Sequence, residues 1–451
     1  MPARNDPRTI FGWAMYDWAN SAYATTVMAA LLPAYFTRSV VPAGGWTFLG
    51  HTMGGEALWG YLVGGVTFVI FLVTPVLGAI ADFSATKKRF LRAFAYGGAL
   101  FAICLFFVRP GHVGLAMGLF LVTQAGFVGG NVFYDGFLPD ITAPDTIDRV
   151  SAKGYGLGYV GGGLQFALAM ALVTLHDRVG IGTDLAVRIA LASSGAWWLG
   201  FSIFALGRLE ETGRARPLPA ALEGAPRPVA YARVGFGRVA ATLRKLVGFR
   251  QLLLFLVAYL IYNDGIQTTI NMASAYAVGT LRLTVVSVMV TLLIVQFVAF
   301  GGAFFFGWVS GRMSTRGAVL VCLAVYGLVA VAAFRLPTGR AVPFFALGAA
   351  IGFVQGGAQS LSRSLYGSMI PEDASAEFYG FYSVLSRFSA IWGPLLFAFV
   401  ADTTGSGRHA ILSLVVFFVV GGVLLAVVDI DAARASKARW SFADEGAGSA
   451  G

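Results

Sequence analysis

Long runs of apolar residues alternate with short polar segments from the start of the chain to about residue 428. Runs of about 18 or more such residues can cross a bilayer as helices, and their lack of alternation argues against the strands of a membrane barrel. No small-residue cleavage site follows the first run, so we expect a retained helix there. Hydropathy places twelve spans, at 10–36, 58–80, 91–108, 113–137, 154–175, 186–206, 251–278, 284–306, 317–335, 342–363, 378–400 and 410–428.

The longest polar segment divides these spans into two sets of six. We expect an N-terminal bundle over 1–206, a basic cytoplasmic linker over 207–250, a C-terminal bundle over 251–430 and a cytoplasmic tail over 431–451. Three pairs of segments match in the same order in the two halves: 20–30 with 263–273, 78–88 with 307–317, and 139–156 with 368–383. The matches indicate an internal duplication. The predicted fold is therefore all-α and integral to the membrane, with twelve transmembrane helices in two pseudo-symmetric six-helix bundles.

Composition and charge agree with a membrane protein and predict its orientation. Hydrophobic residues make up 57% of the chain and charged residues only 12%, whereas soluble proteins carry about 25% charged residues. With a cytoplasmic N-terminus, 22 of the 32 Lys and Arg residues lie on the cytoplasmic side and eight on the other, while Arg363 and Arg387 lie within spans. Both termini are therefore expected in the cytoplasm. Topology and contact with anionic lipid explain the net charge of +10, so nucleic acid is not an expected partner.

Polar residues inside the spans recur at three-helix intervals. Because an intramembrane charge is costly, such residues normally face the interior of a bundle or a wet cavity. Spans one, four, seven and ten carry most of them, and spans five, eight and eleven carry one each. They are Asp17, Asn20, Gln124, Asn131, Asp135, Gln165, Asn263, Asp264, Gln267, Asn271, Gln296, Gln355, Gln359, Arg363 and Arg387.

Two aspartates and one arginine fall deep in the predicted bilayer. At 1.5 Å per residue, Asp17 lies roughly 10 Å from the start of its helix, and Asp264 and Arg387 lie about 20 and 15 Å from the cytoplasmic ends of theirs. A function is the preferred interpretation for both aspartates. For Arg387, a structural ion pair with one of them is as good an explanation as substrate contact.

Asp135 and Arg363 occupy near-equivalent places, close to the cytoplasmic ends of spans four and ten. Opposite charges at these places predict an inner gate that closes by pairing. Reversal of both charges should then rescue the single reversals.

Helix packing competes with function for the uncharged residues. A single Asn or Gln in a membrane helix can equally serve as an interhelical hydrogen-bonding group. The glycine-rich start of span five, 154–163, is likewise better explained by close helix packing than by a binding loop.

Three motifs resemble those of the vacuole effluxer family of the major facilitator superfamily. They are YDWANSAYATT near the start, FYDGFLPDI at 133–141 followed by RVSAKGYGLGYVGG, and YNDGIQTTI at 262–270. The resemblance implies a twelve-helix fold in which spans one, four, seven and ten line a central cavity. It also implies efflux of small solutes, which are amino acids in the fungal members.

The superfamily's loop motif between spans two and three is present in part. Gly78, Asp82, Lys87 and Lys88 match it, whereas Ala85 and Thr86 depart from it. In the second half Gly311 occupies the aspartate position. The resemblance therefore implies that Asp82 acts alone as a cytoplasmic latch, stabilised by helix N-termini and by nearby cations such as Lys87.

These observations predict a secondary transporter that works by alternating access. Arg387 with Asp17 or Asp264 could hold the carboxylate and amine of an amino acid, with Asn20, Asn263, Gln267 and Gln359 nearby; either aspartate could instead carry a coupling proton. A membrane-embedded enzyme and a lipid-moving protein are the alternatives.

The remaining expectations are mostly negative. No Gly-Lys dipeptide occurs, which argues against a Walker-type phosphate loop. Cys104 and Cys322 lie within apolar runs and the four histidines in predicted external loops, so neither a disulfide nor a metal site is expected. We expect no cofactor, a monomer, and residence in a bacterial plasma membrane.

Overall fold

A computed structural model of the chain describes residues 4–437 apart from 49, 212–214, 216, 220–221, 223 and 247. The predicted tail beyond 437 lies outside the described residues. The side chain of Arg387 does too, although its backbone belongs to a helix.

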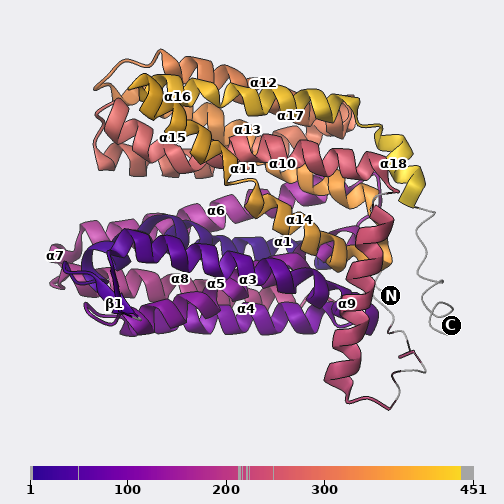
Figure 1. Cartoon of the computed structure of the whole chain (residues 1–451). Helices are drawn as coiled ribbons and strands as arrows, with labels where there is room; N and C mark the ends of the chain where they lie inside the picture. Colours follow the sequence, from indigo (N-terminus) through magenta and orange to yellow (C-terminus); the bar gives the residue numbers. More distant parts are fainter. Residues whose placement is uncertain are drawn as a thin grey trace.

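The first half of the chain forms one group of helices, drawn in indigo to magenta in Figure 1. The first spanning stretch is helical from residue 7 to 40, with two π-helical segments. Its elements are α1 (Pro7–Ala22), η1 (Tyr23–Leu31), α2 (Leu32–Tyr35), η2 (Phe36–Val40), β1 (Trp46–Phe48), β2 (His51–Met53), α3 (Gly55–Ser84), α4 (Lys87–Cys104), η3 (Leu105–Phe107), α5 (Val113–Ile141), α6 (Ile147–Thr174), α7 (His176–Val179) and α8 (Thr183–Leu206).

The second half forms a second group, drawn in orange to yellow, and α14 crosses toward the first group. Its elements are α10 (Arg250–Ala275), η5 (Tyr276–Thr280), α11 (Val285–Met313), α12 (Thr315–Phe334), α13 (Ala341–Met369), η6 (Glu372–Ala374), α14 (Ser375–Phe388), α15 (Trp392–Thr404), α16 (Gly407–Ser413), α17 (Val415–Val427) and α18 (Ile430–Lys437). Helix α9 (Arg227–Leu246) lies between the two groups in the sequence.

The helices agree with the predicted membrane fold. Among the residues that the structure describes, nine helices are long and apolar enough to cross a membrane. The stretch from α1 to η2, helix α3 and the pair α14–α15 are consistent with the three remaining predicted spans. Several helices extend past the predicted spans, as α13 does to Met369. Hydropathy marks only the apolar part of a helix and not the polar turns that follow it.

Some features were not predicted, and two of them bear on the site. The eleventh span is broken between α14 and α15, and the linker contains α9. Hydropathy misses both features. The residues around the break are apolar like the rest of the span, and the apolar residues of α9 are interrupted by basic ones.

The two ends of the bundle differ. The N-terminus, α9 and α18 lie at one end, which we call the termini end (Figure 1). The antiparallel hairpin of β1 and β2 and the short helix α7 lie at the opposite end, the hairpin end. The first helix begins at the termini end, where the backbone N–H and hydroxyl of Thr9 both donate to Asp6. These hydrogen bonds lower the pKa of Asp6.

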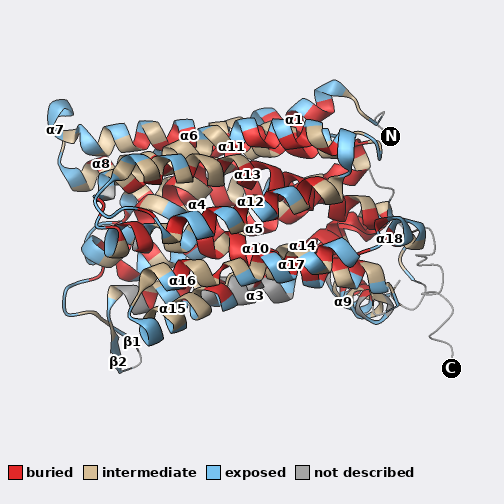
Figure 2. Cartoon of the chain, turned by 90° about the horizontal axis from the view of Figure 1, so that it is seen from above, coloured by how far each residue is buried: buried red, intermediate tan, exposed pale blue. Residues whose placement is uncertain are grey.

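Buried residues form the centre of the bundle, and exposed residues lie along its rim (Figure 2). Glycines allow some helices to touch through their backbones. A Cβ on Gly161 of α6 would lie 2.5 Å from the carbonyl oxygen of Trp18 in α1, and one on Gly162 would lie 2.9 Å from that of Ser21. The glycine-rich segment is therefore a helix surface packed on α1, and the packing interpretation is confirmed.

Candidate functional site

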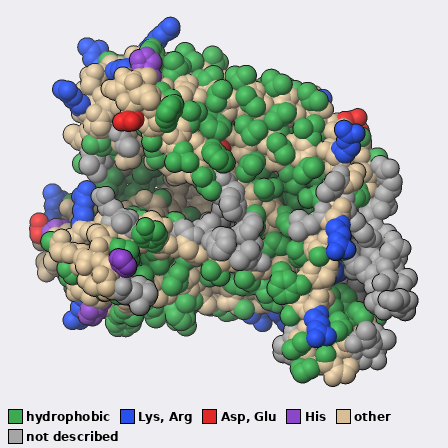
Figure 3. Space-filling view, viewed as in Figure 1, with side chains coloured by type: hydrophobic (Ala, Val, Ile, Leu, Met, Phe, Trp, Pro, Cys, Tyr) green, Lys and Arg blue, Asp and Glu red, His purple; other side chains and the backbone are tan. Residues whose placement is uncertain are grey.

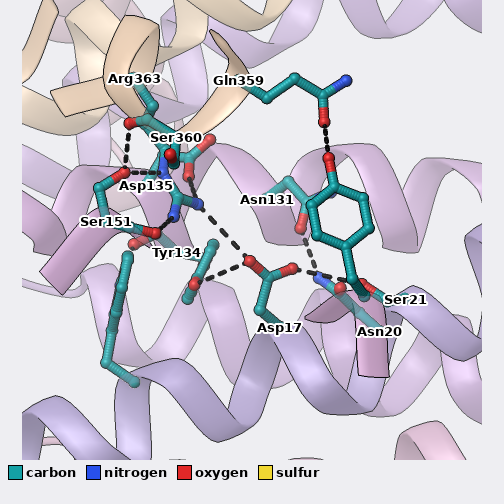
Figure 4. A network of polar contacts seen from close by, with 12 residues as sticks. Asp17, Asn20, Ser21, Asn131, Tyr134, Asp135, Ser151, Gln359, Ser360 and Arg363 are labelled. Atoms are coloured by element: carbon teal, nitrogen blue, oxygen red, sulfur yellow. Dashed lines mark hydrogen bonds and ion pairs between the residues drawn. The ribbon is translucent and has the colours of Figure 1, made fainter. Parts of the chain in front are cut away.

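Arg363 of α13 joins the two halves of the molecule near the termini end. Its Nη1 atom lies 3.0 Å from Oδ1 of Asp135 in α5 and 3.7 Å from Oδ2 of Asp17 in α1 (Figure 4). The Arg363 side chain is 2% exposed, and those of Asp17 and Asp135 are 13% and 18% exposed. The pairing of Asp135 with Arg363 matches the geometry expected of the inner gate.

The other nitrogens of Arg363 contact α6. Nε donates to the Ser151 hydroxyl at 3.0 Å, and Nη2 donates to the Ser151 carbonyl oxygen at 2.9 Å. The Ser151 hydroxyl in turn donates to the carbonyl oxygen of Ser360 at 2.7 Å. The guanidinium also lies 4.1 Å from the ring centre of Tyr155 and 4.9 Å from that of Trp13. A planar guanidinium suits such an arrangement, because it stacks on rings while its N–H groups donate in plane.

Asp17 is held by neighbours from its own half. Tyr134 donates its hydroxyl to Oδ2 of Asp17 at 3.2 Å, and Ser21 donates to Oδ1 at 3.4 Å. A Cβ on Gly158 would lie 3.0 Å from the carboxyl carbon of Asp17, so a larger residue there would push against the Asp17 side chain. Asp17, Asp135 and Arg363 together carry a net charge of −1 when all three are ionised.

The predicted amides Asn20 and Gln359 also make contacts between helices. The side chain of Asn20 donates to that of Asn131, within the first half. Tyr159 of α6 donates to Gln359 of α13, which connects the two halves. A second such contact runs from Gln296 to Thr25 at 2.7 Å. Asn20 is buried and Gln359 is partly buried; their contacts with Asn131 and Tyr159 are drawn in Figure 4.

Asp264 caps the broken eleventh span. Its two carboxylate oxygens accept backbone N–H groups of Trp392 at 3.0 Å and Gly393 at 2.9 Å, in the first turn of α15. Neighbouring Asn263 donates to Ser389 in the break and to the carbonyl oxygen of Ser386 at 3.3 Å. A buried carboxylate at a helix N-terminus is stabilised there. The structure thus gives Asp264 a use in the fold, which competes with the predicted substrate or proton role.

Gln267 lies on α10, just past Asp264, and is partly buried. Arg387 lies at the end of α14, before the break. Because its side chain is outside the described residues, its predicted pairing with an aspartate stays a prediction.

Asp82 and Lys87 lie together at the termini end. Lys87 Nζ lies 3.1 Å from Oδ1 of Asp82 and 2.7 Å from Oδ2 of Asp140, and it donates to the Ser375 hydroxyl at 2.6 Å. The other oxygen of Asp82 accepts the backbone N–H of Glu377 at 2.9 Å. Asp82 of α3 therefore contacts the N-terminus of α14 in the other half, which is the arrangement that the resemblance implied for a closed latch.

The termini end is tightly closed around these contacts. A Cβ on Gly78 of α3 would lie 2.5 Å from the carbonyl oxygen of Ala376 in α14, and one on Gly136 of α5 would lie 3.0 Å from the Cα of the same residue. At the hairpin end the two halves diverge, and Figure 3 shows a hollow between them. The molecule is thus open at the hairpin end and closed at the termini end.

Several contact residues were not predicted. Tyr134, Ser151 and Ser375 carry no charge, and such residues are common in membrane helices for packing. Asp140 and Glu377 lay in loops or at span edges by hydropathy. Their signal was proximity to the predicted latch and gate: Asp140 follows Asp135 by five residues, and Glu377 lies within the segment that matches 139–156 in the internal repeat.

Comparison with known proteins agrees with this architecture. The family model described as "Vacuole effluxer Atg22 like" matches residues 5–438. An uncharacterised MFS-type transporter, YxiO, of Bacillus subtilis (strain 168) is 32% identical, over 92% of this chain and 94% of the relative. Autophagy-related protein 22 of Coccidioides immitis is 26% identical, over 82% of this chain and 72% of the relative.

Solved structures share the fold at low identity. The major facilitator transporter FucP in its outward conformation aligns with a TM-score of 0.66 at 12% identity, covering 94% of this chain and 99% of FucP. The human organic anion transporter MFSD10 aligns with a TM-score of 0.65 at 15% identity, covering 94% of this chain and all of MFSD10. The fold and the family are those of transporters, not of enzymes. The chain is a multi-pass integral membrane transporter that belongs to the vacuole effluxer Atg22-like family of the major facilitator superfamily.

Proposed function

We propose that this protein is a secondary active transporter that moves amino acids by alternating access. The observation that carries the proposal is Arg363, a buried cation near the closed termini end that binds two carboxylates of the opposite half. Each of these ion pairs joins helices that must separate when the termini end opens. A charged solute that binds to Arg363 or to these carboxylates would therefore change whether the termini end is open or closed.

An amino acid fits the charges of this cluster. Its carboxylate can pair with the guanidinium of Arg363, and its ammonium group can pair with Asp17 or Asp135, so that solute replaces contacts between the halves. In the second version of the proposal Asp17 carries a coupling proton, which neutralises the net charge of −1 and weakens the hold on Arg363. Asn20, Asn263, Gln267, Gln359 and Arg387 remain proposed members of the surrounding site.

The gate and the latch act together in this cycle. The inner gate is the pair of Asp135 and Arg363, and the latch is Asp82 with Lys87 at the start of α14. Opening the termini end requires both to break. The basic residues favour cytoplasmic termini, so the conformation described above is outward-facing, and a monomer in a bacterial plasma membrane suffices for the cycle.

Counterflow in proteoliposomes tests the proposal. Purified protein is reconstituted in liposomes loaded with unlabelled amino acids, and uptake of radiolabelled amino acids is measured for the wild type and for Asp17→Asn. We expect uptake by the wild type, and we expect its loss in Asp17→Asn in the version of the proposal in which Asp17 binds the solute. Asp431→Asn is the matched control, because Asp431 is 96% exposed on α18. Folded protein without counterflow of any amino acid would contradict the substrate assignment, and movement of labelled phospholipid instead would make lipid the cargo.

The two versions differ in their response to a proton gradient. If Asp17 carries the proton, Asp17→Asn keeps counterflow, which needs no net proton movement, but loses accumulation driven by a pH gradient. If Asp17 binds the solute, both are lost.

A further inference from the structure

Helix α9 lies crosswise at the termini end of the bundle (Figure 1). The spanning helices run along the membrane normal, so a crosswise helix at their ends lies along the membrane surface. That is the orientation of an interfacial amphipathic helix.

The inner face of α9 contacts both halves of the transporter. Gly235 packs on α3, where its Cβ would lie 2.8 Å from the side chain of Ile80, and Tyr231 meets the ring of Phe83 edge-on at 6.3 Å. Arg238 Nε lies 3.4 Å from Oε2 of Glu377 in α14, with side chains 2% and 0% exposed. The inner face thus connects α3 and α14 beside the latch, because the backbone N–H of Glu377 is the group that Asp82 accepts.

The outer face of α9 is basic and apolar. Arg227, Arg233 and Arg244 are exposed, and Phe236 and Val229 are 64% and 45% exposed. The helix sequence, RPVAYARVGFGRVAATLRKL, contains no Asp or Glu. Exposed basic residues beside exposed apolar ones characterise helices that bind the surface of an anionic membrane.

We propose that α9 is a lipid-binding strap: its outer face binds anionic phospholipid headgroups of the adjacent leaflet, and its inner face holds the termini end closed. Lipid is favoured over an acidic protein segment because α9 already lies along the bilayer surface, where Phe236 can enter the headgroup region. The lipid-binding part is independent of the proposed transport, and the closure part rests on alternating access.

The buried pair supplies the link between lipid and closure. Opening the termini end moves α14 away from α3 and takes Glu377 away from Arg238, and loss of one partner of a buried ion pair is strongly unfavourable. Anionic lipid that fixes α9 against the bundle therefore favours the closed termini end.

Lipid binding is tested on the full chain in nanodiscs. A fluorophore is placed on α9 at Gly237→Cys, an exposed position with open space for a side chain, after replacement of Cys104 and Cys322. We expect stronger quenching by brominated phosphatidylglycerol than by brominated phosphatidylcholine. Each cation near an anionic surface contributes about a fivefold factor in binding. The triple variant Arg227→Gln, Arg233→Gln, Arg244→Gln removes three cations and should therefore reduce the preference about a hundredfold.

The matched control removes three exposed arginines at the hairpin end, by Arg109→Gln, Arg178→Gln and Arg340→Gln. It should leave the preference unchanged. Equal quenching by the two lipids, or an equal loss in both triple variants, would overturn lipid binding by α9.

Closure is tested by spin-label distances between Arg89→Cys and Ala432→Cys, exposed sites on the two halves at the termini end. We expect phosphatidylglycerol to raise the short-distance population, and we expect both the triple variant and Glu377→Gln to remove this response. Lipid preference at Gly237 with no change in distances would overturn the coupling. Failure of amino-acid counterflow changes neither readout, so it would count against the proposed substrate alone.

Discussion

Arg363 contacts several groups of the first half at the closed end, and not only the carboxylate of Asp135. Besides Asp135 and Asp17 it binds the hydroxyl and carbonyl of Ser151 and stacks beside Tyr155. Removal of one partner of a buried charge is strongly destabilising, because the charge is then left uncompensated. These contacts fix the position of its side chain in the closed conformation, and under the proposed cycle we expect opening to break them.

Charge reversal at single positions should disable the gate. Asp135→Arg places two guanidinium groups together, and Arg363→Asp gathers three carboxylates; loss of a buried pair typically costs about 3–5 kcal/mol. We expect both single variants to lose counterflow and to melt at lower temperature. The double variant Asp135→Arg, Arg363→Asp should recover part of both, but not all, because the new arginine lies away from Ser151.

Arg340→Asp, a reversal at an exposed position of the hairpin end, is the control for general effects of charge. A double variant no better than the worse single variant would refute pairing as the basis of the gate.

The charged part of this site could be predicted from the sequence, but its geometry could not. Asp17, Asp135 and Arg363 are costly in a membrane, so their presence alone marks them. The hydroxyls of Tyr134 and Ser151 carry no such signal, and neither do the backbone amides that Asp264 accepts. Depth in the bilayer identified Asp264 correctly as unusual, while its partners depend on a break that lies 125 or more residues further along the chain.

At the scale of elements, the break between α14 and α15 is held by a cap. Asp264 binds the first backbone N–H groups of α15, and Asn263 binds Ser389 in the break itself. The sequence does contain a signal for this break, Gly393-Pro394, since proline is tolerated in the first turn of a helix and not in its interior.

Substitution of Asp264 separates a cap from a transport group. Asparagine keeps one acceptor oxygen, so Asp264→Asn should cost less stability than the about 1 kcal/mol that is typical when alanine replaces a helix cap, and it should retain most counterflow. Asp264→Ala removes both acceptors and should lower the melting temperature and transport further. Asp17→Asn is measured under the same conditions for comparison. If Asp264→Asn and Asp17→Asn both lost transport completely with unchanged stability, Asp264 would bind the solute or the proton and would not act only as a cap.

The helices themselves were predictable for a simple physical reason. Inside a bilayer every backbone polar group must be satisfied within the segment, so an apolar run of sufficient length becomes a helix regardless of its neighbours. Helix α9 escapes this rule because it lies at the surface, where its apolar residues are interrupted by arginines and its position depends on the contacts of Gly235 and Arg238.

At the scale of the molecule, closure of the termini end depends on close approach of α3 and α14. Gly78 touches the backbone at Ala376, with 2.5 Å between its hypothetical Cβ and the carbonyl oxygen. Any side chain there forces the two helices apart, and the contact of Asp82 with the N-terminus of α14, one turn away, loosens with it.

Gly78→Val should therefore shift the transporter toward an open termini end. We expect a longer spin-label distance between Arg89→Cys and Ala432→Cys and a reduced rate of counterflow, because the cycle can no longer complete closure at this end. Gly60→Val is the matched control: Gly60 lies on the same helix with no atom near its hypothetical Cβ, and it should leave distance and rate unchanged. An unaltered distance in folded Gly78→Val would mean that α14 yields locally. Closure would then depend on the ion pairs of Arg363 and Lys87 and not on the fit of the helices.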